Sequence, residues 1–313
     1  MPKILLGNNY DDASWAILTE CVPEEYEVSQ LEEVSQVALA AAIEDADYLI
    51  ASGRLHIDAN VINCAKRLKL IARTGVGLDS IDLDALRVAG VKLVVNSGVN
   101  ADSVAEHTLL LILAALRMLP EANERVKAGC WPKREIGLQT HELAGKSVYI
   151  VGQGSIGSRV AELLAPFGCD VFGTNRAVKG SLPLEFFEAD IVTLHCPLTQ
   201  ETRHLIDADA IARMKFGSIL INTARGGLID EYALAEGLRV GRPGYACLDV
   251  RDVEPSFDIS PFDEVDNIIL TPHMAGITYE SFKSMISGAI SNIVEFDRGL
   301  CLTEIDKTLG KDL

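Results

Sequence analysis

Short apolar runs alternate with helix-like segments along the first third of the chain. Five such runs stand before residue 96, and each has the length of one buried strand. Alternation of this kind predicts a parallel sheet with helices on both faces. The predicted strands are Lys3–Leu6, Tyr26–Ser29, Tyr48–Ala51, Leu68–Ala72 and Lys92–Val95, and the predicted helices lie near Ala13–Glu20, Val34–Ala42, Ala59–Ala65 and Asp82–Ala89.

The same alternation continues after residue 145. Two of the predicted helices there begin with an Asp, a residue suited to capping a helix N-terminus. The predicted strands are Ser147–Val151, Asp170–Gly173, Asp190–Leu194, Ser218–Asn222, Gly244–Val250 and Asn267–Leu270, and the two helices are Asp207–Met214 and Asp230–Val240.

The last predicted helix, near Tyr279–Arg298, has no strand of its own. The pattern therefore predicts two α/β units, the first near residues 1–99 and the second near 100–275. From the pattern alone, the final helix either covers the second unit or returns to the first. Its apolar face contains Phe282, Met285, Ile286, Ala289, Ile290 and Ile293.

The segment between the two units contains a helix that is apolar on nearly every side, Thr108–Met118. We expect a helix of this composition to be buried between domains or subunits. Pro120 is predicted to end it, and a polar connector containing Trp131 then leads to residue 145.

A glycine-rich turn follows the predicted strand Ser147–Val151 and precedes a predicted helix, Ser158–Phe167. The turn has the pattern G-x-G-x-x-G, and its position between a strand and a helix is the context that a dinucleotide-binding fingerprint requires. Gly152 allows the tight turn, Gly154 lets a pyrophosphate approach the backbone, and Gly157 lets the helix pack on the strand. The N-terminus of the helix favours phosphate.

Size, charge and cysteine content narrow the class of protein. A chain of 313 residues favours two domains, and its formal net charge of −17 disfavours nucleic acid and anionic membrane surfaces as partners. The apolar run Leu109–Leu116 is too short to span a bilayer, and the N-terminus enters a strand without a signal peptide. The seven cysteines form no C-x-x-C pair, which indicates reduced thiols and a cytoplasmic protein.

Three polar residues follow predicted strands of the second unit, where a doubly wound sheet places its active site. Arg225 lies in a glycine-rich loop, Glu254 precedes a proline that favours an extended backbone, and His273 follows the last strand. Together with further motifs they resemble the D-isomer-specific 2-hydroxyacid dehydrogenases over nearly the whole chain. The motifs are Thr223-Ala-Arg-Gly, Leu248-Asp-Val…Glu254-Pro, Pro272-His-x-Ala-Gly276, Asn96…Val104-Ala-Glu-His107, Leu143-x-Gly-Lys146 and Leu194-His-Cys-Pro-Leu-Thr-Gln-Glu-Thr-Arg-His-Leu-Ile206.

The resemblance implies an α/β fold of two doubly wound parallel-sheet domains with the active site in the cleft. In it, a Rossmann dinucleotide-binding domain (100–275) is inserted in a flavodoxin-like substrate domain (1–99 plus 276–313), to which the final helix returns. It also implies a homodimer built partly on the helix after Asn100, and oxidoreduction between a small anionic 2-keto acid and its D-2-hydroxy acid.

The resemblance also implies roles that agree with the chemistry of the side chains. Arg225 holds the carboxylate and polarises the carbonyl, His273 donates the proton, and Glu254 fixes the tautomer of His273. The implied cofactor-binding residues are Val104, Gly152, Gly154, Ser155, Ile156, Gly157, Asn175, Arg176, Cys196, Pro197, Thr202, Thr223, Ala224, Asp249 and Gly276. The implied substrate-binding residues are Arg54, His56, Arg73, Gly75, Val76 and Gly77, with Trp131 a candidate for the pocket mouth and no metal ligand among them.

The end of the second strand of the Rossmann domain bears on the choice of cofactor. Asn175 stands where NAD-using members of the family commonly carry Asp, and Arg176 follows it. Without a carboxylate to repel a 2′-phosphate, and with an arginine to pair with one, we expect NADP rather than NAD, with Thr174 and Lys179 able to assist.

Several alternatives remain open from the sequence. The NADP-leaning pattern resembles glyoxylate/hydroxypyruvate reductases more than phosphoglycerate dehydrogenases. A non-catalytic dinucleotide-sensing corepressor shares the fold, whereas formate enzymes of the family carry Gln in place of Glu254. A second anionic group on the substrate, such as phosphate or sulfonate, could meet Arg54, His56 or Arg73.

Overall fold

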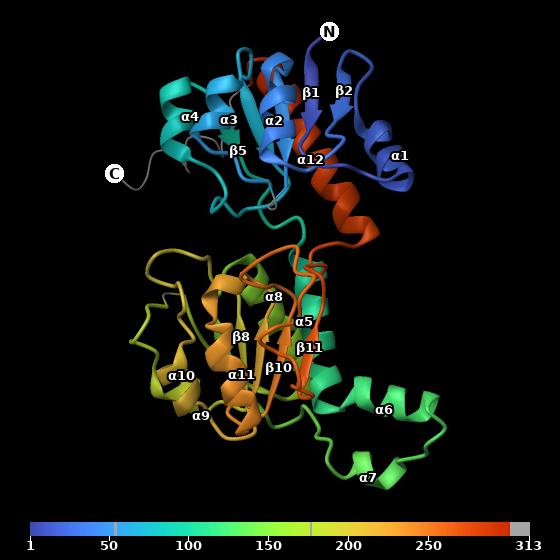
Figure 1. The fold of residues 1–313 in the computed structure, drawn as a ribbon, viewed down its shortest axis with the longest axis vertical. Coiled ribbons are helices and arrows are strands. Elements are labelled where there is room, and N and C mark those ends of the chain that lie inside the picture. Colours follow the sequence, from blue (N-terminus) through green and yellow to red (C-terminus); the bar gives the residue numbers. More distant parts are fainter. Residues whose placement is uncertain (53–54, 176, 301–313) are drawn as a thin grey trace. The chain divides into compact units, whose positions relative to one another are not determined.

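The structure is a computed structural model and describes residues 1–52, 55–175 and 177–300. The chain divides into two compact units (Figure 1). Unit 1 is Met1–Asn100 together with the helix that begins at Tyr279, and unit 2 is Ala101–Thr278. We describe each unit by itself.

Unit 1 contains a five-stranded parallel sheet in the order β2-β1-β3-β4-β5, the flavodoxin-like order. Every residue of β3 and β4 is buried, as expected for central strands with helices on both faces. The strands are β1 (Lys3–Leu6), β2 (Glu27–Gln30), β3 (Tyr48–Ala51), β4 (Leu70–Arg73) and β5 (Lys92–Val94). The helices are α1 (Asp12–Cys21), α2 (Gln36–Ala42), α3 (Ala59–Cys64), α4 (Leu83–Ala89) and α12 (Tyr279–Asp297), with a short 3₁₀ helix at Ile43–Asp45.

The final helix α12 packs on unit 1, which decides between the two positions that the pattern allowed. Its buried residues join a core formed by β1, β3, β4 and α1. Asn96 Nδ2 donates to the carbonyl of Met285 at 2.9 Å and so ties the end of the β5 segment to α12. The predicted apolar face is the buried one, except that Phe282 is only half-buried.

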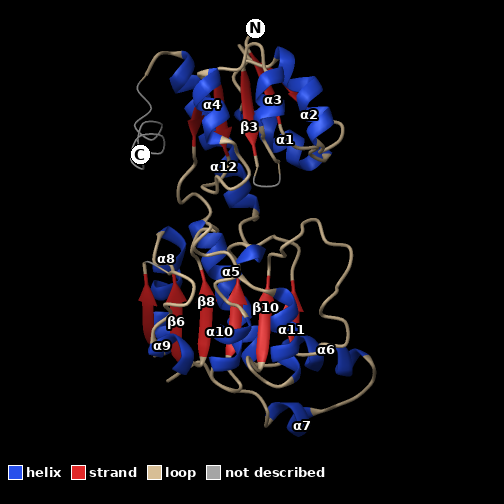
Figure 2. Ribbon diagram, turned by 60° about the vertical axis from the view of Figure 1, so that its left-hand side comes forward, coloured by secondary structure: helices blue, strands red, loops and turns tan. Residues whose placement is uncertain are grey.

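Unit 2 contains a six-stranded parallel sheet in the order β11-β10-β9-β8-β6-β7 (Figure 2). The strand order reverses between β6 and β8, the switch point at which doubly wound sheets bind ligands. Helices α5 and α8 share a core with one face of this sheet, and α9, α10 and α11 share a core with the other. The fold is therefore α/β with two parallel sheets, as the sequence predicted.

The elements of unit 2 lie close to their predicted positions. The strands are β6 (Ser147–Val151), β7 (Asp170–Thr174), β8 (Ile191–Leu194), β9 (Ile219–Asn222), β10 (Tyr245–Leu248) and β11 (Ile268–Leu270). The helices are α5 (Ala101–Leu116), α6 (Leu119–Lys127), α7 (Lys133–Gly137), α8 (Ser155–Leu164), α9 (Leu184–Glu188), α10 (Ala208–Arg213) and α11 (Glu231–Arg239), with 3₁₀ turns at Ala165–Phe167 and Gly226–Leu228.

The segment from α5 to α7 differs from the prediction. Pro120 does not end the apolar helix: α5 ends at Leu116, Met118 adopts a left-handed φ of 47°, and Pro120 lies in the first turn of α6, where its missing N–H costs no hydrogen bond. The predicted polar connector contains α6 and α7. The apolar character of α5 is explained by its packing on α8 and the sheet of its own unit, although Leu110 is 53% exposed.

No single helix in the described ranges is both long and apolar enough to cross a membrane. Helices α5 and α6 reach the necessary length and composition only when taken together, and a bend of 63° separates them.

Candidate active site

The turn after β6 can be built only with glycine at two of its positions. Gly152 has a φ of +94°, and a Cβ there would lie 2.7 Å from the backbone of His195 and Cys196. A Cβ on Gly157 would lie 1.9 Å from the carbonyl oxygen of Gly152. The turn is therefore packed against both the end of β8 and the first turn of α8.

The side of this turn that faces outward is open. A Cβ on Gly154 would meet no atom within 4 Å, and both Gly154 and Ser155 are exposed. Helix α8 begins at Ser155, three residues earlier than predicted, so the N–H groups of Ser155 and Ile156 belong to its first turn, which has no intrahelical acceptors. A closed turn beside an open helix N-terminus fits the pyrophosphate of a dinucleotide.

The three residues with candidate acid–base or anion-binding chemistry follow β9, β10 and β11. These strands are parallel, so their carboxyl ends lie at one edge of the sheet. Arg225 follows β9, Glu254 lies in the loop between β10 and β11 (249–267), and His273 follows β11. We call the connection between β10 and β11, residues 249–267, the β10–β11 loop.

Glu254 and His273 are in direct contact. His273 Nδ1 lies 2.5 Å from Glu254 Oε2, and the side chains are 36% and 24% exposed respectively. The other carboxylate oxygen, Oε1, accepts a hydrogen bond from the backbone N–H of Arg251 at 2.9 Å. With Nδ1 donating to the carboxylate, Nε2 is the imidazole nitrogen that remains for proton exchange.

The backbone of His273 has a positive φ of 55°, uncommon for a residue with a side chain. Its N–H donates to the carbonyl oxygen of Asp249 at 2.7 Å. The Asp249 carboxylate, almost fully buried, accepts from the N–H groups of Met274 and Ala275 at 2.9 and 2.8 Å. Asp249 thus holds the backbone on both sides of the His273 side chain.

Two residues that sequence reasoning did not assign to the site complete this arrangement. The Thr271 hydroxyl donates to Asp249 Oδ1 at 2.6 Å, and His107 Nε2 on α5 lies 3.3 Å from the same hydroxyl. The sequence carries no signal for these contacts, because they join residues more than twenty positions apart.

Arg225 is half-buried at the start of the Gly226–Leu228 turn. Its Nη1 donates to the carbonyl of Ala224 at 2.7 Å, and its own carbonyl accepts from Asn222 Nδ2 at 2.8 Å. A Cβ on Gly226 would lie 1.9 Å from the carbonyl carbon of Arg251. The Arg225 segment therefore packs directly on the loop that carries Glu254.

Several residues that the resemblance assigned to cofactor binding have buried side chains. The Thr223 hydroxyl lies 3.2 Å from that of Thr108, which in turn donates to the carbonyl of Val104 at 2.8 Å. The Thr202 hydroxyl donates to the carbonyl of Pro197 at 2.7 Å. Burial raises the pKa of the Cys196 thiol to about 11, in agreement with packing rather than nucleophilic chemistry. These side chains stabilise the loops at the strand ends from within.

The surroundings of His195, directly after β8, shift its pKa strongly. Its Nε2 lies 2.9 Å from the Thr193 hydroxyl, and its Nδ1 is buried without a hydrogen-bond partner among the described residues. Burial lowers the pKa of His195 to about 3, so the imidazole is neutral at physiological pH.

The candidate residues for cofactor choice follow β7. Asn175 is exposed directly after this strand, whereas Arg176 lies outside the described residues. Lys179 Nζ forms an ion pair with Asp207 at 3.2 Å. Within the described ranges, no three His, Cys, Asp or Glu side chains are grouped as a metal site would require.

The substrate-binding candidates of unit 1 have mixed environments. Arg73 is 2% exposed, and its guanidinium donates to the carbonyls of Ser52 and Gly77, so it braces two loops and offers no open surface to a substrate anion. His56 and Val76 are exposed, and a Cβ on Gly75 would meet nothing within 4 Å. Arg54 lies outside the described residues.

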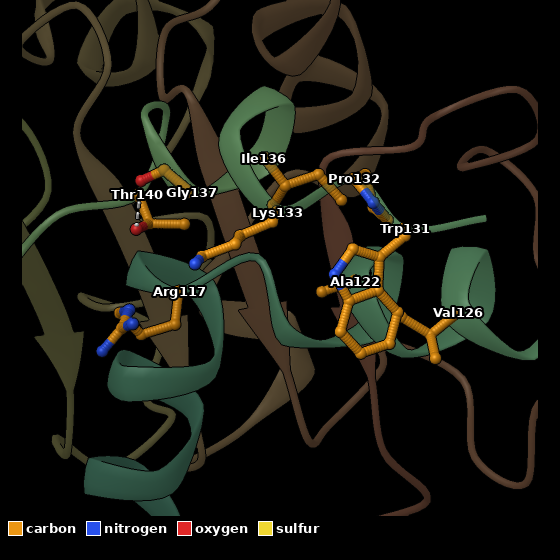
Figure 3. A pocket seen from close by; sticks show the side chains of 9 residues that line it. All are labelled: Arg117, Ala122, Val126, Trp131, Pro132, Lys133, Ile136, Gly137 and Thr140. Carbon is orange, nitrogen blue, oxygen red and sulfur yellow. Dashed lines mark hydrogen bonds between the residues drawn. The ribbon is translucent and has the colours of Figure 1, made fainter.

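Trp131, the candidate for the pocket mouth, lies at the surface of unit 2, and its role there stays a prediction. It lines a cavity of about 410 Å³ formed by the end of α5, α6 and α7 (Figure 3). None of the three candidate catalytic residues lines this cavity. Trp131 is 79% exposed, so its surroundings are those of a surface residue.

Comparisons with known proteins agree with the geometry of unit 2. The family model for the "D-isomer specific 2-hydroxyacid dehydrogenase, NAD binding domain" matches residues 109–275. The chain is 38% identical to a D-3-phosphoglycerate dehydrogenase of Mycobacterium leprae over 293 residues, which cover 90% of this chain and 54% of that protein. It is also 38% identical to a hydroxypyruvate reductase of Thermotoga maritima over 273 residues, which cover 82% of this chain and 87% of that one.

A solved structure resembles the whole chain. The crystal structure of a Thermus thermophilus protein matches with a TM-score of 0.86 and 32% identity, over 96% of this chain and 99% of that one. The chain spans about half the length of the Mycobacterium leprae relative.

Proposed function

Because the chain belongs to the D-isomer specific 2-hydroxyacid dehydrogenase family, as an oxidoreductase of CH–OH groups with NAD(P), we propose that it interconverts a small 2-keto acid and its D-2-hydroxy acid. The proposed activity is like that of a glyoxylate or hydroxypyruvate reductase. The observation that carries this proposal is the 2.5 Å contact between His273 Nδ1 and Glu254 Oε2 at the carboxyl edge of the nucleotide-binding sheet.

The proposed proton transfer uses the imidazole of His273. Reduction of a keto acid requires a proton at the carbonyl oxygen, and His273 Nε2 delivers it, then removes it again in the reverse reaction. Glu254 holds the Nδ1 proton and stabilises the imidazolium form that donates. When bound, the reduced nicotinamide supplies the hydride for the carbonyl carbon.

The proposed substrate-binding residues offer donors to the carboxylate and the carbonyl of the keto acid. Arg225 offers a planar guanidinium that can pair with a carboxylate and polarise the neighbouring carbonyl. For unit 1, we propose that the segment from Gly75 to Gly77, in which Val76 is exposed, offers backbone N–H groups to a carboxylate. With a net charge of −17, the chain needs such local donors to attract an anionic substrate.

A substrate panel tests the proposal. Glyoxylate, hydroxypyruvate, pyruvate, phosphohydroxypyruvate and bulkier keto acids are each offered with NADH and NADPH. We expect turnover with at least one small keto acid, loss of nearly all of it in Arg225→Ala, and normal turnover in Arg239→Ala, which removes an exposed arginine of α11. Absence of nicotinamide oxidation with every substrate would favour a dinucleotide-sensing protein.

We further propose that NADP is favoured over NAD. The support is Asn175, which follows β7 with an exposed amide at the position where a carboxylate would repel the 2′-phosphate. We expect kcat/KM to be higher with NADPH than with NADH, and Asn175→Asp to shift that ratio towards NADH by about tenfold or more. An unmodified protein that prefers NADH would overturn this choice of cofactor without affecting the reaction class.

We also propose that the chain forms a homodimer through the α5–α7 segment. Leu110 and Leu119 are each 53% exposed there, Trp131 is 79% exposed and Leu138 is 84% exposed. Apolar side chains exposed in such number over one segment are typical of a surface that a second protein covers.

A further inference from the structure

Arg251 and Glu231 form an ion pair beside the candidate active site. Arg251 lies in the β10–β11 loop, and Glu231 is the first residue of α11. Arg251 Nε and Nη2 donate to the two carboxylate oxygens of Glu231 at 3.0 to 3.1 Å, and each side chain is only 12% exposed. The bidentate geometry and the low exposure distinguish this pair from ordinary surface ion pairs.

Further contacts restrain the guanidinium of Arg251. Nη2 also donates to the carbonyl of Ser260 at 2.8 Å, and the guanidinium carbon lies 5.0 Å from the ring centroid of Phe262, which is buried. Arg251 thus connects the beginning of the β10–β11 loop with a point about ten residues later in the same loop. The loop is closed on itself and attached to α11 through one side chain.

The backbone of residues 251 and 252 contacts residues of the proposed active site and of the ion pair. Its N–H donates to Glu254 Oε1 at 2.9 Å, and the next N–H, that of Asp252, donates to Glu231 Oε1 at 2.9 Å. A Cβ on Gly226 would lie only 1.9 Å from the carbonyl carbon of Arg251. The peptide that contains this carbonyl therefore packs directly on Gly226, the residue after Arg225. The two peptide groups that flank Arg251 therefore contact Glu254 on one side, through the N–H of Arg251, and the residue after Arg225 on the other, through the carbonyl of Arg251.

We propose that the Glu231–Arg251 pair is a positioning clamp for the catalytic residues. It holds the peptide groups on both sides of Arg251 in place, and through them it sets the position of Glu254 against His273 and the spacing to Arg225. Neither residue touches the reacting atoms, so both are positioning residues; the inference rests on the proposed function of that site. A displacement of about 1 Å in such a support lowers turnover by roughly 100-fold in enzymes.

The test uses the full-length protein and a double-mutant cycle. Arg251→Met keeps the length of the side chain and removes the guanidinium, Glu231→Gln removes the charge with little change in shape, and the double variant carries both. Arg239→Met is the matched control, because Arg239 forms an exposed ion pair with Glu236 on the same helix. The readouts are kcat with the best keto acid and the Kd of NADPH, measured by its fluorescence.

We expect kcat to fall roughly 10- to 100-fold in Arg251→Met and less in Glu231→Gln. The Kd of NADPH stays within about twofold of the unmodified value, since the fingerprint after β6 is untouched, and the double variant is no slower than Arg251→Met. The clamp would be overturned if the losses in kcat of the two single variants multiply in the double variant, or if the Kd of NADPH rises in proportion to the loss of kcat. It would also be overturned if Arg251→Met behaves like Arg239→Met. An unmodified protein without turnover would overturn the proposed function, and the clamp with it.

Discussion

Glu254 and His273 stand 19 residues apart in the sequence, and their contact depends on how the backbone of His273 is held. Asp249 supplies that support through its carbonyl and its buried carboxylate. A left-handed residue of this kind persists only where surrounding bonds determine it, and such residues are typical of functional sites. At this scale, the side chain that we propose as the proton donor is separate from the residues that orient it.

The charge of Glu254 is tested by Glu254→Gln. The amide oxygen can still accept a hydrogen bond from the Nδ1–H of His273, but it carries no charge to stabilise the imidazolium form. We expect kcat/KM for keto acid reduction to fall roughly 10- to 100-fold. Steady-state rates at one pH measure the loss.

The matched control for this variant is Glu236→Gln, which removes a carboxylate from an exposed ion pair on α11. It should leave the rate unchanged. A Glu254→Gln protein with the same rate as Glu236→Gln would show that the carboxylate has no part in proton transfer.

At the scale of elements, period and propensity predicted the strands of both sheets to within about two residues, because buried parallel strands are short, continuous apolar runs. The helices that were missed are α6, α7 and α9. Helix α6 buries no residue among those described, and α7 and α9 are only five residues long, so none has an apolar period that a sequence can display.

His195, directly after β8, makes the stability of unit 2 depend on pH. Its pKa is about 3 in the folded protein and about 6.5 in an unfolded chain, so the unfolded chain binds one more proton between these values. The free energy of unfolding therefore falls as the pH drops below about 6.5, by about 1.4 kcal/mol per pH unit. The stability that depends on a neutral His195 imidazole is fully present above about pH 6.5.

We expect His195→Asn to remove this part of the pH dependence. Between pH 6.5 and 5.0, the unmodified protein should lose about 2 kcal/mol more than the variant, measured by urea unfolding at both pH values. His141→Asn, at an exposed histidine, should retain the dependence of the unmodified protein. Equal losses in His195→Asn and the unmodified protein would contradict the burial of a neutral imidazole.

At the scale of the whole molecule, the sequence predicted which strand ends hold the candidate catalytic residues and, through the resemblance, the pairing of Glu254 with His273, but not the contacts that hold these residues in place. The motifs identified Arg225, Glu254 and His273, and the parallel sheet explains why they share one edge. The clamp of Glu231 and Arg251 joins residues 20 positions apart on different elements, and no periodic pattern encodes such a pair. Arg73 shows the converse, because this charged residue at the end of β4, beside a glycine-rich loop, is buried against backbone carbonyls.

The proposed homodimer is tested by Leu138→Glu, which places a charge at an apolar position that is 84% exposed. Sedimentation equilibrium should give twice the 33.8 kDa mass of one chain for the unmodified protein, and the mass of one chain for the variant. Leu184→Glu, at a leucine of α9 that is 64% exposed, is the control and should sediment like the unmodified protein. A single-chain mass for the unmodified protein would contradict the dimer.

The fate of a deuterium label tests the central claim most directly. The protein is incubated with the best keto acid that gives a chiral product, which excludes glyoxylate, and with reduced nicotinamide cofactor carrying two deuterium atoms at C4. The product is examined by NMR and chiral chromatography. The account predicts a D-2-hydroxy acid with one deuterium on C2, and loss of its formation in His273→Gln. A product without deuterium at C2, or one of L configuration, would contradict it.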